Sequence, residues 1–145
     1  MAASGLKILI VEDQFLIAKQ VEMIALAGGH RIVGIADTLA AACRLAMEVE
    51  PDVALVDLSL ADGVTGTAIG QFIKEQCNAE VVYMTANISR LPDDFIGALG
   101  VVEKPFARSD LLAALGYIAA IVLDGLRPEN VPPGLRLAPA HMSSL

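Results

Sequence analysis

The sequence is poor in basic, aromatic and cysteine residues, and each shortage excludes a class of protein. Only 10 lysines and arginines stand against 17 aspartates and glutamates, which gives a formal net charge of −7. Such a chain lacks the basic surface that binds nucleic acid or anionic membranes, so neither is expected as a partner. The two cysteines, Cys43 and Cys77, have no Cys-x-x-Cys spacing and no histidine cluster near them. Zinc binding and redox chemistry are therefore not indicated.

A leader segment and a membrane-spanning segment are also missing from the pattern. The first residues run directly into a strand-like stretch, without the basic segment and long apolar run of a secretory signal. We therefore expect a cytoplasmic protein. With 145 residues and 55% hydrophobic composition, the chain can build one domain with a well-buried core.

Short runs rich in valine and isoleucine alternate with segments of helical length. The runs are typical of buried strands and cover residues 6–11, 31–35, 53–56, 80–84 and 100–102. The segments of helical periodicity cover residues 14–27, 38–50, 64–77 and 108–123. Strands that alternate with helices predict an α/β fold, with a doubly wound, five-stranded parallel sheet covered on both faces.

Two regions depart from this regular alternation. Between Thr85 and Gly100, Pro92 is followed by two aspartates and few apolar residues remain, so we expect a short, irregular or mobile fourth helix. Residues 124–145 are too rich in proline for a helix and too short for a domain. We expect one domain over residues 1–123, followed by a proline-rich C-terminal tail.

The predicted fifth helix carries no charge over residues 111–123. These 13 residues are too few to span a bilayer, so membrane insertion is not expected. One stripe of the helix can face the core, but Leu112, Ala119 and Leu123 lie outside that stripe. Either the tail folds back over this face or a second subunit covers it, and we favour a homodimer or partner surface.

Polar residues follow four of the predicted strands at the point where each strand ends. Glu12 and Asp13 follow the first strand, Asp57 ends the third, Thr85 follows the fourth and Lys104 follows the fifth. In a parallel sheet these positions share the carboxyl edge, where open α/β folds bind their ligands. We expect these five side chains to converge there.

Three carboxylates at one edge require a positive counter-charge. Two carboxylates about 4 Å apart repel by about 4 kcal/mol at an effective dielectric constant of about 20. Oxygen ligands without histidine or cysteine favour a hard cation, namely Mg²⁺ or Mn²⁺, which keeps waters and accepts phosphate oxygens. Lys104 adds a charge suited to a phosphoryl oxygen. Asp57, flanked by the metal and Lys104, is therefore a candidate phosphoryl acceptor.

Short motifs at these strand ends resemble those of one family, the receiver domains of two-component response regulators. They are Val-Glu-Asp at 11–13, Leu-Val-Asp-Leu at 55–58, Asp-Gly at 62–63, Met-Thr-Ala at 84–86 and Lys-Pro-Phe at 104–106. Each motif is weak alone, but five in order, each at its strand end, are highly specific. The resemblance covers residues 5 to about 123 and implies a flavodoxin-like sheet of strand order 2-1-3-4-5.

The resemblance implies a phosphorylation site with a bound metal. Asp57 would accept a phosphoryl group from a histidine kinase or a histidine phosphotransfer protein. Asp13 and Asp57 would ligate Mg²⁺ directly, Glu12 would act mostly through water, and the backbone carbonyl of Ser59 would be a further ligand. The first helix, which also carries Phe15 and other apolar residues outside its core stripe, would lie near the phosphodonor.

The resemblance also implies how the phosphorylated state would be sensed. Thr85 would be the switch hydroxyl, assisted by the amide of Ala86, and Lys104 would pair with the phosphoryl group. A cis bond between Lys104 and Pro105 would aim the lysine into the site. Ser59 and Asn87 match positions that tune self-dephosphorylation.

One departure concerns the output of the signal. The family usually has an aromatic residue three positions before the lysine, whose rotation accompanies that of the threonine, but this chain has Val101 there. The stretch between Thr85 and Lys104 also looks a few residues shorter than usual. We therefore expect the output surface to be a reshaped loop and helix.

These features favour a stand-alone response regulator that acts through protein–protein contacts and is not a turnover enzyme. A phosphorylation-independent interaction scaffold is an alternative, although all five site positions are filled. A Mg²⁺-dependent aspartyl phosphatase would need a general acid two residues after the nucleophile, where this chain has Ser59. A flavodoxin-like cofactor module would offer amides and hydroxyls after the first strand, whereas Glu12 and Asp13 repel phosphate.

Overall fold

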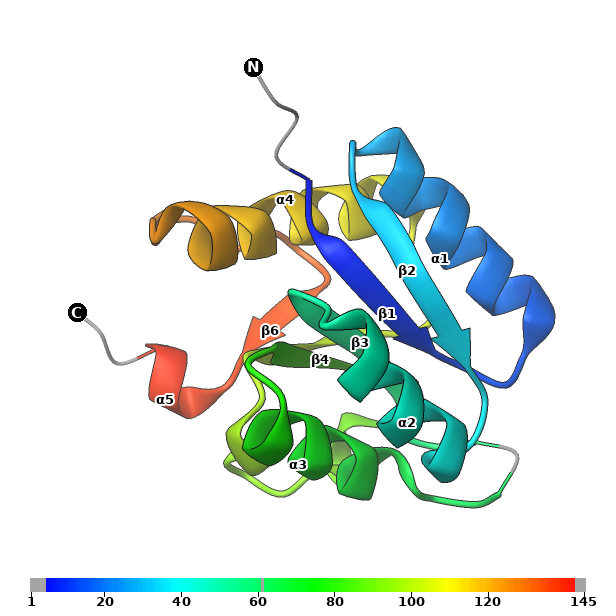
Figure 1. Cartoon of the computed structure of the whole chain (residues 1–145). Coiled ribbons are helices and arrows are strands. Elements are labelled where there is room, and N and C mark those ends of the chain that lie inside the picture. The colour runs from blue at the N-terminus through cyan, green and yellow to red at the C-terminus, as the bar shows by residue number, and fades with distance from the viewer. Residues whose placement is uncertain (1–4, 61, 143–145) are drawn as a thin grey trace.

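The valine- and isoleucine-rich runs form one sheet, and the segments between them form its covering layers (Figure 1). The structure, a computed structural model, describes residues 5–60 and 62–142. The strands are β1 (Lys7–Val11), β2 (Arg31–Ala36), β3 (Val53–Asp57), β4 (Glu80–Thr85), β5 (Gly100–Glu103) and β6 (Leu135–Leu137). The α-helices are α1 (Phe15–Ala27), α2 (Leu39–Val49), α3 (Gly66–Gln76), α4 (Arg108–Asp124) and α5 (Pro139–Met142). Two single 3-10 turns, η1 (Ile88–Arg90) and η2 (Phe95–Gly97), stand between β4 and β5.

The sheet has the strand order β2-β1-β3-β4-β5-β6. The first five strands pair with one another in the parallel direction, which confirms the predicted doubly wound sheet of order 2-1-3-4-5. The sixth strand was not predicted. It pairs with β5 in the antiparallel direction.

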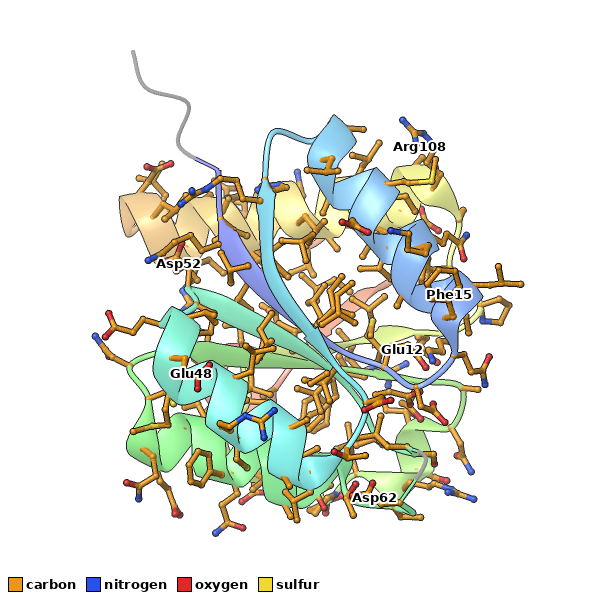
Figure 2. All side chains as sticks on the ribbon, turned by 45° about the vertical axis from the view of Figure 1, so that its right-hand side comes forward. Glu12, Phe15, Glu48, Asp52, Asp62 and Arg108 are labelled. Carbon is orange, nitrogen blue, oxygen red and sulfur yellow. The ribbon has the colours of Figure 1, made fainter. Side chains whose placement is uncertain are left out.

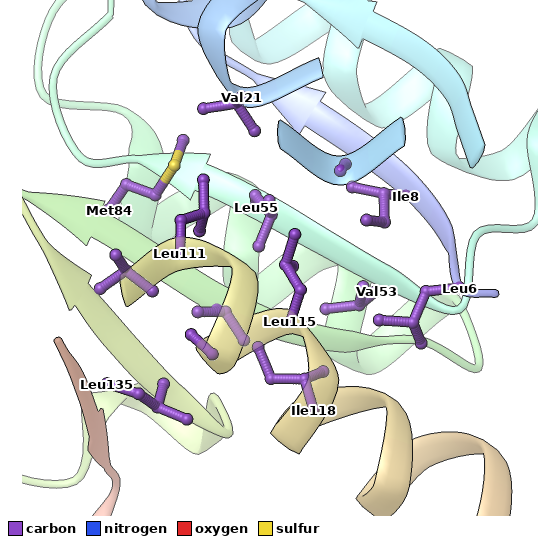
Figure 3. Close-up of a cluster of buried hydrophobic side chains, with 14 of the residues drawn as sticks. Leu6, Ile8, Val21, Val53, Leu55, Met84, Leu111, Leu115, Ile118 and Leu135 are labelled. Carbon is purple, nitrogen blue, oxygen red and sulfur yellow. The ribbon is translucent and has the colours of Figure 1, made fainter. Parts of the chain in front are cut away.

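Alternate residues of the strands face two separate hydrophobic cores. On one face, Ile8 of β1 and Leu55 of β3 pack with the inward stripes of α1 and α4 (Figure 3). On the other face, Leu9 and Val56 pack with α2 and α3. Because the central strands are buried on both faces, their runs of apolar residues show no alternation with polar ones.

The C-terminal segment, which the sequence predicts to be a proline-rich tail, forms strand β6 and the short helix α5. Leu135 and Leu137 of β6 are buried in the same cluster as the inward residues of α4. The Tyr117 hydroxyl of α4 donates a hydrogen bond to the carbonyl of Pro128 at 3.0 Å. The tail thus contacts α4 through the core cluster and Tyr117, whereas Leu112 and Ala119 line an open pocket beside Gly28 and His30. Neither cover expected for that face is confirmed, and the homodimer stays a prediction. No helix in the described ranges has both the length and the apolar character needed to cross a bilayer.

The region between β4 and β5 confirms the expected irregular fourth helix. In place of a helix, the chain forms η1 and η2, joined through Pro92. The Asp94 carboxylate accepts a hydrogen bond from the amide of Ile96, which caps η2. Phe95 and Ile96 both have positive φ angles, of 54° and 51°. This conformation is strained for an aromatic and a β-branched residue, so the segment stores backbone strain shortly before β5 begins.

Tyr83 of β4 is buried with an unsatisfied hydroxyl group. Among the described residues its side-chain oxygen has no hydrogen-bond partner. Burial, with a smaller effect of the Asp94 charge, raises the pKa of Tyr83 to about 12. The ring end lies against α3 at Gly70, where a Cβ atom would fall 2.0 Å from the tyrosine oxygen. The glycine is therefore required by close packing.

We expect Tyr83→Phe to stabilise the fold by about 1 kcal/mol, because it removes a buried hydroxyl that lacks a partner. Gly70→Ala should destabilise the protein, and part of that loss should be recovered in the double variant. Urea unfolding of the four proteins measures both effects. A Tyr83→Phe protein less stable than wild type would contradict the expectation.

His30 has a structural role at the amino edge of the sheet. Its side chain is buried, and its Nδ1 accepts a hydrogen bond from the amide of Leu6 at 3.0 Å. Burial lowers the pKa of His30 below its ordinary value. The folded state therefore resists protonation more than the unfolded chain does.

We expect His30 to make stability fall as the pH is lowered. Below the ordinary pKa of about 6.5 the unfolded chain gains a proton, and stability declines until the lower pKa of the folded state is passed. His30→Asn keeps a hydrogen-bond acceptor but does not titrate. Urea unfolding at pH 7.5 and pH 5.5 should show a larger loss for wild type than for this variant. An equal loss in both proteins would refute the assignment.

Candidate functional site

Asp57 is the last residue of β3 and lies at the carboxyl edge of the sheet. Its side chain is nearly buried, and its Oδ1 accepts a hydrogen bond from the amide of Ser59 at 3.2 Å. The first turn of α3 packs against the backbone beside it, because a Cβ atom at Gly66 would fall 2.3 Å from the carbonyl oxygen of Asp57. This packing limits how Asp57 can move.

Lys104, which follows β5, joins two carboxylates across the site. Its Nζ lies 2.8 Å from Oε1 of Glu12 and 3.0 Å from Oδ2 of Asp57. Partial burial alone would lower the pKa of Lys104, but the hydrogen bonds to both carboxylates raise it above the ordinary value. The ammonium group therefore stays charged at neutral pH. It supplies the counter-charge predicted from the sequence.

Glu12 follows β1 and is buried at the same edge, while Asp52 lies at the opposite edge of the sheet (Figure 2). Burial is the main cause that raises the pKa of Glu12 to about 6, and the hydrogen bond to Lys104 opposes it. The second Glu12 oxygen accepts a hydrogen bond from the amide of Gln14 at 3.2 Å. The carboxylate is thus fixed on both sides.

The three predicted carboxylates meet at this edge. Glu12, Asp13 and Asp57 each offer an oxygen, and these oxygens lie within 4.8 Å of one another. Asp13 is exposed, which leaves one side open to solvent. An open set of carboxylate oxygens fits a hard divalent cation that keeps some of its waters. The donor set is therefore compatible with the predicted metal.

Thr85 ends β4 with its hydroxyl bound to the following loop. The hydroxyl oxygen accepts a hydrogen bond from the amide of Asn87 at 3.0 Å and donates one to the carbonyl of the same residue at 3.3 Å. The Asn87 side chain in turn accepts a hydrogen bond from the amide of Ser89 and caps η1. Thr85 is therefore linked by hydrogen bonds to the irregular segment between β4 and β5, residues 86–98.

An open cleft of about 320 Å³ lies beside Asp57. It is lined by residues that include Ser59, Thr85, Ala86, Asn87, Arg90 and Lys104. Sequence reasoning identified all of these except Arg90. Its Nη1 donates a hydrogen bond to the Ser59 hydroxyl at 3.3 Å. The sequence does show that Arg90 is the one basic residue between Thr85 and Lys104. A single basic residue in a loop forms no periodic pattern, so this observation alone does not identify a site residue.

Two further predicted positions take definite places. The Lys104–Pro105 peptide bond is cis, as the resemblance implied. Val101 is fully buried in β5, and it pairs in register with Tyr83 of β4. The aromatic ring in this part of the structure thus belongs to β4, and the position expected for a rotating aromatic holds a small buried side chain.

Comparison with known proteins finds one family and a consistent group of relatives. The family model described as response regulator receiver domain matches residues 8–116. The phyllosphere-induced regulator PhyR of Methylorubrum extorquens is 31% identical over 111 residues, which are 75% of this chain and 42% of that protein. The chain therefore spans less than half the length of this curated relative.

Solved structures agree with the sequence match. The solution structure of the PhyR receiver domain of Erythrobacter litoralis has a TM-score of 0.73 at 29% identity, and the match covers 88% of this chain and 97% of that one. The crystal structure of the anti-anti-sigma factor PhyR of Bartonella quintana has a TM-score of 0.70 at 29% identity, over 83% of this chain and 49% of that one.

We expect Lys104→Met to lower stability by about 2 kcal/mol, because it leaves Glu12 and Asp57 without their shared cation. Added Mg²⁺ should restore part of this loss. The matched control is Lys74→Met, which breaks the partly exposed pair with Glu80 at 3.1 Å and should cost less than about 1 kcal/mol. Calorimetry of each variant with and without MgCl₂ gives the comparison. Equal losses in the two variants would show that the site ion pair is not special.

Proposed function

Because this chain belongs to the receiver domain family of response regulators, we propose that it takes part in a two-component phosphorelay and accepts a phosphoryl group on Asp57. The single observation that carries the proposal is the contact of the Asp57 carboxylate with the ammonium of Lys104, 3.0 Å away, at the floor of an open cleft. A buried carboxylate beside a fixed cation suits attack on an anionic phosphoryl group.

The proposed step transfers a phosphoryl group from a histidine of a kinase or phosphotransfer protein. An oxygen of Asp57 attacks phosphorus, the bond between phosphorus and the histidine nitrogen breaks, and that nitrogen keeps the electron pair. Lys104 neutralises oxygens of the transferring group. The chain acts as a signalling switch, in which the phosphorylated state of Asp57 carries the signal until water removes the phosphoryl group as phosphate.

Glu12, Asp13 and Asp57, with the carbonyl of Ser59, would hold the divalent cation of the site. The donor chemistry fits Mg²⁺ or Mn²⁺, which when bound supplies positive charge to phosphoryl oxygens. Glu12 and Asp57 are positioned by Lys104, so the protein residues that serve the metal and those that serve the phosphoryl group are parts of one network.

The phosphodonor is proposed to dock beside α1. Four apolar side chains on this helix are exposed, namely Phe15 (71%), Leu16 (80%), Met23 (65%) and Leu26 (53%). Phe15 projects from the start of the helix, near the acidic edge (Figure 2). Exposed apolar groups of this size suit a surface that a protein partner covers.

The switch is proposed to act through Thr85. To reach a phosphoryl group on Asp57, its hydroxyl must leave both Asn87 contacts, and this movement disturbs the cap of η1. The signal then passes to partner proteins through the segment 86–98. Asn87 and Ser59, which border the cleft, set how readily water reaches the phosphoryl group.

Intact-mass measurement after incubation with acetyl phosphate and MgCl₂ tests the proposal. We expect one added phosphoryl group on the wild-type protein, and none on Asp57→Asn or when Mg²⁺ is chelated. The same adduct on Asp57→Asn would place the acceptor elsewhere. A complete absence of adduct, together with no binding of beryllofluoride, would favour an interaction scaffold that works without phosphorylation.

A further inference from the structure

Arg90 brings a second cationic side chain of the chain to the cleft beside Asp57. It belongs to η1, and its Nη1 donates a hydrogen bond to the hydroxyl of Ser59 at 3.3 Å. The amide of Ser59 donates in turn to Oδ1 of Asp57. One residue thus separates the guanidinium from the proposed acceptor.

The Arg90 guanidinium is available for another ligand. The residue is exposed, and within the described ranges it forms no ion pair with a carboxylate. Its contact with Ser59 is a single, rather long bond to a neutral hydroxyl, which is weaker than a bond to an anion. The guanidinium can exchange this bond for a stronger one without leaving a buried group unpaired.

The charge balance of the site changes when Asp57 carries a phosphoryl group. The edge already holds three carboxylates, and Lys104 is shared between two of them. A phosphoryl group adds about one to two further negative charges and three acceptor oxygens. An arginine matches such oxygens with paired donors, whereas a lysine presents a point charge.

The position of Arg90 in the chain connects this charge change to the surface. Arg90 ends η1, which is capped by Asn87 and therefore linked to Thr85. Ile88, the first residue of η1, packs against the hydrophobic core on the α2 and α3 face of the sheet. Leu91, which follows η1, is buried. Movement of the guanidinium toward Asp57 therefore requires η1 to move, and the packing of Ile88 and Leu91 limits how far this short turn can shift.

We propose that Arg90 binds the phosphoryl group on Asp57 and thereby couples phosphorylation to the position of the segment 86–98. The inference rests on the proposed function and deepens it. Arg90 lies outside the five sequence motifs shared with the family, and it senses phosphorylation by binding the phosphoryl group. Through Arg90, the segment 86–98 contacts the phosphoryl oxygens directly. The buried Val101 cannot make such a contact.

Binding of beryllofluoride in the presence of MgCl₂, measured by calorimetric titration, tests this contact. We expect Arg90→Gln to weaken binding about fivefold, the effect of losing one exposed, charge-assisted contact, and Arg90→Lys to fall between it and wild type. The matched control is Arg44→Gln, which removes the same charge from an exposed position on α2 outside the cleft and should bind as wild type does.

Hydrogen exchange of the backbone amides supplies a second readout. Beryllofluoride should slow exchange over residues 86–98 in wild type and Arg44→Gln, and this protection should be reduced in Arg90→Gln. Equal affinity and equal protection in Arg90→Gln and Arg44→Gln would overturn the role of Arg90 while leaving the proposed function intact. Failure of wild type to bind beryllofluoride would instead overturn the proposed function and the inference with it.

Discussion

The ammonium group of Lys104 lies between the carboxylates of Glu12 and Asp57, and this one contact joins the ends of three strands. The partners are 92 and 47 residues apart in sequence, so only the completed sheet brings them together. Without the cation, three carboxylates at one edge would repel one another in a partly buried place. The ion pairs of Lys104 therefore stabilise the site, and the same charged groups are those proposed to take part in phosphoryl transfer.

The strands and the convergence of polar residues could be predicted because both follow from short-range patterns. Valine- and isoleucine-rich runs mark buried strands, and the carboxyl ends of parallel strands must share an edge. Thr38 likewise caps α2 as its residue type indicates, since its hydroxyl accepts a hydrogen bond from the amide of Ala41 at 3.2 Å. Local chemistry was enough in each case.

The features that escaped prediction depend on contacts between distant parts of the chain. Strand β6 has three residues, Leu135–Leu137, and stands in a stretch where proline and glycine dominate, so its pairing with β5 leaves almost no local pattern. Arg90 gains its place in the cleft only through the path of the chain after Thr85. The pairing of Tyr83 beside Val101 similarly becomes visible only in the register of β4 and β5. The roles assigned to the site residues stay predictions.

Strand β6 also decides which border of the sheet can accept another backbone. By pairing with β5, it occupies amide and carbonyl groups that would otherwise offer a template for a foreign strand. Within the described structure, the borders of the sheet are β2, which contacts α1 and α2, and the three-residue β6. Because β5 is paired on both sides, its backbone beside the irregular segment is already used within the molecule, so a protein that binds there meets side chains or the short outer border of β6.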